Sequence, residues 1–309
     1  MNPLPHPFGR TLAALGGAVL ALGLLAGCGN DDTKTAGAAG TPTGDASTAP
    51  TSPAASDGVS APTGEPSTGT PSAIPAYYVG KTPQGDRLFR EFTQVSGVDK
   101  LVAAAAAVTS GSTVDPDYRT VWPQGRFASV TQSADAITVT LKDDGWLQAG
   151  SLKPAEARLA VQQLVYTLQG TIGKRLPIKV DYAGKPAATL LGVDASAGLK
   201  AAPELDVLAL VNVTEPAQGT VVSGSFTAEG RASSFEATVP WELRDASGKV
   251  VKKGFATAEG WADKLYPWST KVDVKGLAPG SYTFVARTDD PSDGEGAGPT
   301  QDTKVITVT

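Results

Sequence analysis

The stretch Phe235-Glu-Ala-Thr-Val-Pro-Trp-Glu-Leu-Arg244 indicates the fold of the C-terminal part of the chain, because apolar and polar side chains alternate along it. Every second residue from Phe235 to Leu243 is apolar, and a two-residue period is typical of a strand that is buried on one face. Pro240 falls on the outward face and has no N–H to donate to a neighbouring strand. We therefore expect an edge strand at this position.

Further segments with strand-like alternation lie on both sides of this stretch, and helical periodicity is absent between residues 205 and 309. The pattern predicts about seven strands arranged as an all-β sandwich. The sequence Leu277-Ala-Pro-Gly-Ser-Tyr282 is typical of a corner turn in which the Tyr282 hydroxyl bonds to a nearby backbone group. The other expected strands are Leu208–Val213, Val221–Ala228, Val250–Thr257, Lys271–Lys275, Tyr282–Arg287 and Val305–Val308.

Strands and helices are mixed between residues 76 and 195. Pro154 suits the first turn of a helix, and an apolar stripe at helical spacing follows it. An alanine-rich helix is expected over residues 99–110. Because helices and strands do not alternate strictly, the class is α+β. The stripe consists of Ala157, Val161, Leu164, Val165 and Leu168, with Gln162, Gln163 and Gln169 outside it, and strands are expected at 76–80, 87–93, 127–131, 136–141 and 176–182.

Three motifs give the α+β segment a family resemblance. Trp122-Pro-Gln-Gly125, Gln163-Leu-Val-Tyr-Thr-Leu168 and Asp181-Tyr-Ala-Gly-Lys-Pro186 occur in the order found in the GerMN (sporulation and spore germination) domain, which this segment resembles. The C-terminal segment resembles Gmad2, the immunoglobulin-like domain found beside GerMN domains, through Pro216–Gly219 and Gly230–Ser234. The resemblance implies a GerMN-like α+β domain over residues 76–195 and an immunoglobulin-like sandwich over residues 205–309. It also implies a non-enzymatic protein of the cell envelope.

Residues 1–27 have the composition of a bacterial lipoprotein signal peptide. Leu12–Ala26 carries no charge, and at 1.5 Å per residue it spans roughly 22 Å, less than the ~30 Å hydrocarbon core of a bilayer. Leu25-Ala26-Gly27-Cys28 resembles a lipobox, which implies cleavage before Cys28 and a diacylglycerol on its sulfur. An ordinary secretory signal and an uncleaved anchor are the alternatives. We expect the protein to be lipid-anchored on the extracytoplasmic side of the cell membrane.

Residues 28–75 join this anchor to the folded part and consist mainly of Ser, Thr, Pro, Ala and Gly. Such a composition buries too little apolar surface to offset the entropy lost on ordering, so it predicts a disordered linker. Coil statistics give this linker a span on the order of 40 Å. Its hydroxyl side chains are possible acceptors of O-linked sugar, and a plain solvated spacer is the simpler interpretation.

The sparse reactive side chains of the chain exclude several kinds of chemistry. The sequence holds one histidine, His6, and one cysteine, Cys28. Cleavage before Cys28 and its lipidation would leave a mature chain without histidine or free thiol. This argues against Ser-His-Asp and Cys-His catalysis and against His- or Cys-ligated metals. The formal charge of −5 gives no basic face for nucleic acid. We expect no enzymatic activity, no cofactor and no metal.

The best candidate for recognition is an aromatic cluster at Trp261, Tyr266 and Trp268, which lie within eight residues in an expected Gly/Pro-bounded loop. Exposed aromatic rings beside polar groups stack on sugar rings or anchor protein partners. The alternative is that these tryptophans close one end of the sandwich. The sequence therefore predicts an adaptor for envelope protein partners, with a peptidoglycan- or carbohydrate-binding lipoprotein as the alternative.

Three further motifs give weaker signals. Asp143-Asp144 pairs two carboxylates as in a glycosidase, but adjacent residues of an expected hairpin turn point apart. The acidic loop Asp289–Glu295 lacks two of the oxygen ligands that a calcium-binding EF-hand requires, so we expect a solvated loop. Asn212-Val213-Thr214 matches an N-glycosylation motif, which we interpret as chance.

Overall fold

The computed structural model describes residues 72–96, 99–292 and 295–309. The predicted signal peptide, Cys28 and the predicted linker lie outside the described residues. All the described residues belong to one compact unit. No helix in these three ranges is long and apolar enough to span a membrane.

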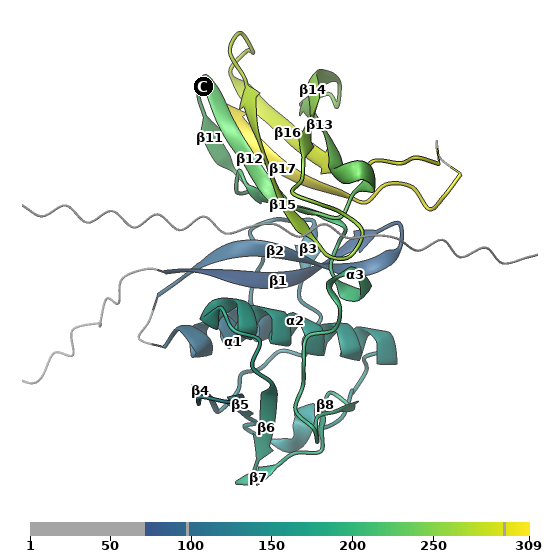
Figure 1. The fold of residues 1–309 in the computed structure, drawn as a ribbon. Helices are drawn as coiled ribbons and strands as arrows, with labels where there is room; N and C mark the ends of the chain where they lie inside the picture. Colours follow the sequence, from purple (N-terminus) through teal and green to yellow (C-terminus); the bar gives the residue numbers. More distant parts are fainter. Residues whose placement is uncertain (1–71, 97–98, 293–294) are drawn as a thin grey trace, which may run out of the picture. The chain divides into compact units, whose positions relative to one another are not determined.

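The chain first forms a small antiparallel sheet (Figure 1). Strand β1 (Ser72–Thr82) turns directly into β2 (Gly85–Val95), and their register places Tyr78 opposite Phe89. The two-residue strand β3 (Tyr118–Arg119) pairs with the other side of β1, which gives the order β2-β1-β3. The predicted strands at 76–80 and 87–93 are thus confirmed, and both are longer than expected.

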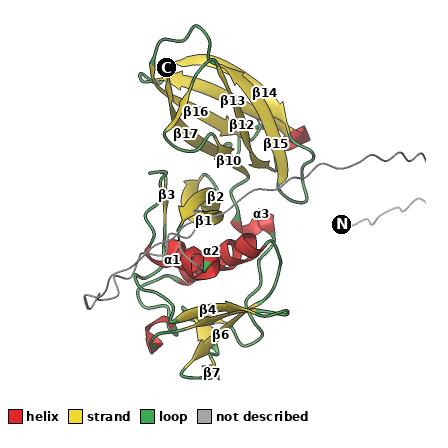
Figure 2. Cartoon of the chain, turned by 90° about the vertical axis from the view of Figure 1, so that its left-hand side faces the viewer, coloured by secondary structure: helices red, strands yellow, loops and turns green. Residues whose placement is uncertain are grey.

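Two helices pack together beside this sheet, as Figure 2 shows. Helix α1 (Lys100–Ser110) begins after Asp99, whose carboxylate accepts from the backbone N–H groups of Leu101 and Val102. Helix α2 (Pro154–Ile172) begins with the predicted proline and ends at Gly173, whose φ of 65° closes the helix in the left-handed region. The predicted apolar stripe of α2 is buried.

A second sheet covers the opposite side of the helices (Figure 2). Its order is β4-β5-β6-β7, in which β5 and β6 run parallel. Its strands are β4 (Ser129–Gln132), β5 (Ile137–Thr140), β6 (Ile178–Tyr182) and β7 (Lys185–Pro186). Elements outside this sheet are the 3-10 turn η1 (Asp144–Trp146), the hairpin of β8 (Thr189–Leu190) and β9 (Val193–Asp194), and the short helix α3 (Glu204–Val207).

The remaining strands form a sandwich of two sheets with its own apolar core. One sheet has the order β10-β12-β15, and the other has the order β11-β17-β16-β13-β14. The all-β prediction is confirmed, with eight strands instead of about seven among the described residues. They are β10 (Val211–Glu215), β11 (Thr220–Val222), β12 (Ser225–Ala232), β13 (Thr238–Asp245), β14 (Val250–Thr257), β15 (Tyr266–Asp273), β16 (Gly280–Arg287) and β17 (Gln301–Val308).

Three details of the predicted strands are wrong. Phe235 starts the 3-10 turn η2 (Phe235–Ala237) instead of a strand, and the residue is 38% exposed. Pro240 lies in an inner strand, which tolerates it because the pairing of β13 with β16 begins only at Trp241. The expected strand Val221–Ala228 is two strands, separated at Gly224, where φ is 67°.

The structure shows the surroundings of Tyr282 and of two glutamines of α2. The Tyr282 hydroxyl donates to the Ala278 carbonyl at 2.9 Å, which confirms the corner turn. Gln163 and Gln169, which fall outside the apolar stripe of α2, are nevertheless buried. Gln169 is accommodated because its Nε2 donates to the Leu176 carbonyl at 2.9 Å.

Candidate functional site

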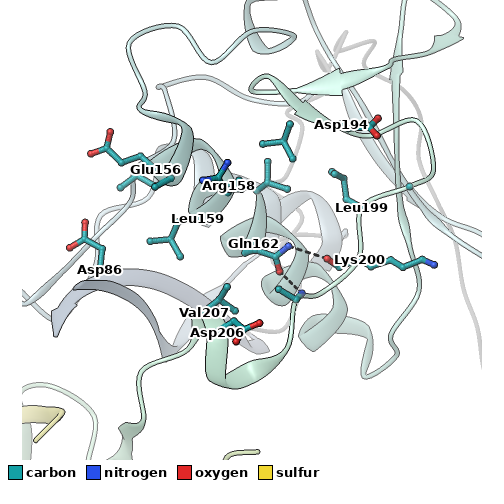
Figure 3. A pocket seen from close by; sticks show the side chains of 16 residues that line it. Asp86, Glu156, Arg158, Leu159, Gln162, Asp194, Leu199, Lys200, Asp206 and Val207 are labelled. Carbon is teal, nitrogen blue, oxygen red and sulfur yellow. Dashed lines mark hydrogen bonds between the residues drawn. The ribbon is translucent and has the colours of Figure 1, made fainter. Parts of the chain in front are cut away.

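A groove of about 620 Å³ lies beside the N-terminal half of helix α2 (Figure 3). The helix forms one wall, and the segment from Val193 to Val207 forms the facing wall. This volume falls within the range of roughly 300–1,000 Å³ that is typical of ligand sites. The apolar part of the lining is made by Val121, Leu159, Val161, Val193, Leu199 and Val207.

Two side chains of α2 hold the facing wall in place. Gln162 donates from Nε2 to the Lys200 carbonyl at 3.0 Å and accepts at Oε1 from the Ala202 N–H at 2.8 Å (Figure 3). Tyr166, one turn further along the helix, donates its hydroxyl to the Ala202 carbonyl at 2.6 Å. The extended segment therefore stands away from α2 at a fixed distance, and the groove is a defined feature of the fold.

Acidic side chains outnumber basic side chains around the groove (Figure 3). Within the described ranges the side chains of Arg158, Lys200 and Asp206 take part in no hydrogen bond or ion pair, so these charges are available to a ligand. The acidic set is Asp86, Glu156, Asp194 and Asp206, and the basic set is Arg158 and Lys200.

Three of the groove carboxylates already have partners. Asp86 pairs with Arg119, and Glu156 accepts from the backbone N–H of Lys153 at 3.0 Å. Asp194 accepts from the Ser196 hydroxyl at 2.6 Å and from its N–H at 3.0 Å. The hydroxyl bond holds the pKa of Asp194 below its ordinary value. These groups favour a negatively charged rim over an acid–base pair that exchanges protons.

A second polar feature is a buried cluster that joins the α+β domain to the sandwich. Lys304 of β17 is 3% exposed, and its ammonium binds the Asp115 carboxylate and donates to the Tyr118 hydroxyl at 2.7 Å. Tyr118 donates in turn to Asp302 Oδ1 at 2.6 Å. The Lys304 ammonium also lies 3.6 Å from Asp302 and over the Tyr118 ring. Residues far apart in sequence are thereby fixed to one another.

Burial and charge set the protonation of this cluster. Burial, with the neighbouring Asp302 carboxylate, raises the pKa of Tyr118 well above its ordinary value, so the phenol keeps its proton. Burial also raises the pKa of Asp115, and the Lys304 ammonium opposes that rise. The Asp302 carboxylate also accepts hydrogen bonds from the Asn212 side-chain nitrogen at 3.0 Å and from the Val213 N–H at 2.6 Å. The cluster contains a positive charge paired with carboxylates, as buried charges require.

The structure does not bring the three predicted aromatic residues together on one surface. Trp268 is in strand β15 with 3% of its surface exposed, so its predicted place in a recognition loop is wrong. Tyr266 begins the same strand and donates its hydroxyl to Asp263 at 2.8 Å. Trp261 is 44% exposed and packs against Phe235, at a ring-centroid distance of 5.2 Å. Strand β15 begins at Tyr266, before the expected start at Lys271. Tyr266 and Trp268 therefore belong to the strand and not to the expected loop.

The other sequence motifs have local structural roles. Asp143 caps η1 by accepting from the Gly145 N–H at 3.0 Å, so the expected hairpin turn is wrong. Asn212 is 5% exposed and its side-chain nitrogen is bound to Asp302, which leaves it inaccessible as a glycosylation site. No three His, Cys, Asp or Glu side chains of the described residues are placed to hold a metal ion. The lipid attachment at Cys28 stays a prediction.

The sequence pattern alone did not reveal either polar site. The groove has no motif, because its lining comes from four separate segments. The buried cluster did have a signal. Ile306 and Val308 point inward, and continuing their alternation backwards places Lys304 and Asp302 inside the sandwich. Charged residues at inward positions of a strand predict a buried ion pair.

Comparisons with known proteins identify both parts of the chain. Residues 75–188 match the family described as sporulation and spore germination, and residues 210–295 match the immunoglobulin-like domain of bacterial spore germination. A search of curated proteins found no match.

Solved structures show only low overall similarity. The chain is 25% identical to CopC from Methylosinus trichosporium OB3b, over 32% of this chain and 92% of that chain, with a TM-score of 0.22. A lytic polysaccharide monooxygenase from Jonesia denitrificans is 14% identical over 30% of this chain and 60% of its own, with a TM-score of 0.20. The tandem GerMN domains of the sporulation protein GerM from Bacillus subtilis are 11% identical over 67% of this chain and 63% of their own, with a TM-score of 0.33.

The family matches agree in order and position with the resemblance drawn from the motifs. The chain carries a GerMN-like sporulation and spore germination domain followed by a Gmad2 immunoglobulin-like domain.

Proposed function

We propose that this protein is a non-catalytic adaptor of the cell envelope, anchored on the extracytoplasmic side of the membrane by lipid on Cys28, and that it binds an envelope protein in the groove beside α2. The groove carries the proposal. It combines an apolar lining, a volume suited to a ligand and a fixed facing wall. The sporulation and germination families of both domains support a role in such a cell process.

The charge of the groove indicates the kind of partner. Asp86 is paired with Arg119, and the three other rim carboxylates outnumber Arg158 and Lys200, so we expect the groove to attract a positively charged segment. An apolar side chain of that segment would contact Leu159 and Leu199, and a neighbouring Lys or Arg would approach the Asp206 carboxylate. This carboxylate has no partner among the described residues, although the Asp206 backbone carbonyl accepts from Arg87. The partner is therefore a protein segment that carries both apolar and basic side chains.

The buried cluster supports an adaptor because it holds the two domains together. Lys304 and Asp302 of the sandwich bind Asp115 and Tyr118 of the GerMN-like domain. A bound partner would then be positioned with respect to both domains. An adaptor needs such a connection between its domains and needs no reactive group.

In-cell crosslinking tests this proposal. A photo-reactive amino acid replaces Arg158, which is exposed in the groove, and a matched one replaces Glu229, which is exposed on β12. We expect the groove position to capture one envelope protein and the control position not to capture it. The Asp206→Lys variant should then abolish the capture. Capture that is equal at both positions, or insensitive to Asp206→Lys, would contradict the proposal.

A further inference from the structure

Phe235 and Trp261 form an exposed aromatic pair on the sandwich. Their rings meet edge to face at 73°, and the two residues are 38% and 44% exposed. In contrast, Trp122, Trp241 and Trp268 are each less than 10% exposed. Two large apolar rings left side by side in water indicate a contact surface for a ligand.

The backbone that presents this pair is strained. Glu236 and Ala237 follow Phe235 with φ values of 51° and 60°, and Ala262 follows Trp261 with a φ of 82°. Residues other than glycine pay about 1–3 kcal/mol for such conformations, and these conformations concentrate at binding sites. Three of the five non-glycine residues with positive φ in the described part of the chain lie within two residues after one of these two aromatic residues.

Hydrogen bonds hold the two strained segments together. The Ala262 N–H donates to Ser233 Oγ at 3.1 Å, which ties the Trp261 segment to the Phe235 segment. The adjacent Ser234 is 2% exposed, and its hydroxyl accepts from the Asp289 N–H at 2.7 Å. The rings are therefore fixed before any ligand arrives, which reduces the entropy cost of binding.

A cavity of about 300 Å³ lies beside the pair and adds polar groups to it. Phe235, Trp261, Ser233, Gln84 and Asp289 are among the residues that line it. The Asp289 carboxylate is exposed and takes part in no hydrogen bond or ion pair with any other residue that the structure describes. The volume is at the lower limit for ligand pockets, which suits a ligand of a single ring.

We propose that this cavity is a binding site for one uncharged pyranose ring of a glycan. The C–H face of the sugar would lie against the Trp261 ring, and its hydroxyls would donate to the Asp289 carboxylate. The negative charge of Asp289 disfavours anionic sugars. A caged cation is disfavoured, because the two rings touch each other and leave no gap for a cation between them. The site uses none of the groove residues, so it is independent of the proposed adaptor function.

Binding of a soluble chitin oligomer, the N-acetylglucosamine tetramer, tests this site. The full chain is purified in a detergent without a sugar headgroup, and acrylamide quenching of tryptophan fluorescence is followed during titration. Trp261 is the most exposed tryptophan of the described residues, so a bound sugar should protect it from quenching in a saturable way. Insoluble peptidoglycan should retain the same protein in a pull-down.

Variants distinguish specific binding at this site from nonspecific adsorption. Trp261→Ala removes the fluorescent reporter, so this variant is tested in the pull-down and should weaken peptidoglycan retention at least tenfold. Asp289→Asn should weaken both tetramer binding and peptidoglycan retention at least tenfold, while Phe255→Ala, which removes an aromatic residue that is 68% exposed on β14, should leave both unchanged. Circular dichroism confirms that each variant is folded. Three results would overturn the proposal. Neither glycan binds, or peptidoglycan retains Trp261→Ala as well as the wild type. In the third, a peptide of residues 41–75, from the predicted linker, binds at Trp261 and the glycans do not. Asp206→Lys should not affect sugar binding, so a failed groove and a failed sugar site give different results.

Discussion

Lys304 determines how the sandwich meets the GerMN-like domain. Its ammonium is almost without contact with water and lies among two carboxylates and a phenol. Removing water from three charges costs several kcal/mol per charge, and their mutual attraction offsets that cost only in good geometry. The cluster is therefore sensitive to the loss of any one member.

Replacement of Lys304 tests the cluster. Lys304→Met leaves the Asp115 and Asp302 carboxylates buried without their cation, and we expect the free energy of unfolding in urea to fall by about 3–5 kcal/mol. Lys179→Met is the matched control. It removes an exposed partner of Asp135 and should cost less than about 1 kcal/mol. Similar losses in the two variants would contradict the account of the cluster.

Buried phenols predict a loss of stability at high pH. The pKa of Tyr166 is raised from 10.0 to about 12, mainly by burial, and that of Tyr118 is raised as well. Between pH 10 and 12 the unfolded chain releases these protons and the folded chain keeps them, so the free energy of unfolding falls as the pH rises.

The Tyr166→Phe variant isolates one phenol. Its free energy of unfolding should differ from that of the wild type by a constant amount below pH 9, roughly one unit under the ordinary tyrosine pKa. Above about pH 10 the variant should lose less stability than the wild type, so the difference moves in its favour. A difference that stays constant up to pH 12 would show that Tyr166 has no raised pKa.

At the scale of elements, helix α2 links the core to the groove. Its apolar stripe, which the sequence predicted, is buried between the two sheets of the GerMN-like domain. Gln162 lies beside that stripe and carries the facing wall of the groove. The sequence does not reveal this role, because the partners of Gln162 are backbone groups about forty residues further along.

Loss of the Gln162 amide should loosen the groove wall. Gln162→Ala removes the acceptor of the Ala202 N–H and the donor to the Lys200 carbonyl, so hydrogen exchange at the Ala202 amide should become faster. The free energy of unfolding should fall by about 1–2 kcal/mol. Gln124→Ala, at an exposed position in the turn after Trp122, is the control and should change neither quantity. Unchanged exchange at Ala202 would contradict the role of Gln162.

The alternation of apolar and polar residues predicted most strands. It failed where a side-chain hydrogen bond to the backbone favoured a turn over a strand. The apolar pattern extends back to Phe235, but the Ser234 hydroxyl bonds to the Thr238 carbonyl and folds Phe235–Ala237 into a turn. Pro240 suggested an edge, and only the register with β16 shows why an inner strand accepts it. Periodicity reports which face of a segment is apolar. It does not report side-chain bonds to the backbone or the length of the neighbouring strand.

At the scale of the whole molecule, the motifs predicted the family and the order of the two domains. Their expected bounds, 76–195 and 205–309, stay predictions, as do the cleavage site and the linker. The groove and the cavity beside Phe235 and Trp261 have no continuous sequence motif, because each is lined by segments that meet only after folding. Trp261 was found from the sequence, but its ring partner is Phe235 and not Tyr266 or Trp268.

The proposed lipid anchor gives a prediction for the intact cell. Cys28→Ser removes the sulfur that the lipid would modify, so the protein should move from the membrane fraction to the soluble or secreted fraction. Metabolic labelling with a fatty acid should mark the wild type and not the variant. Ser47→Ala, in the predicted linker, is the control. A Cys28→Ser protein that stays in the membrane fraction and still carries label would contradict the anchor.

The most direct measurement is the dissociation constant between the purified chain and the envelope protein captured at Arg158, determined with charge-reversal variants. Asp206→Lys should weaken binding at least tenfold, Arg158→Glu should strengthen it, and Glu229→Lys should leave it unchanged, because only the first two alter the charge of the groove. An affinity that is the same for all three variants and the wild type would contradict an adaptor that binds a basic segment in the groove beside α2.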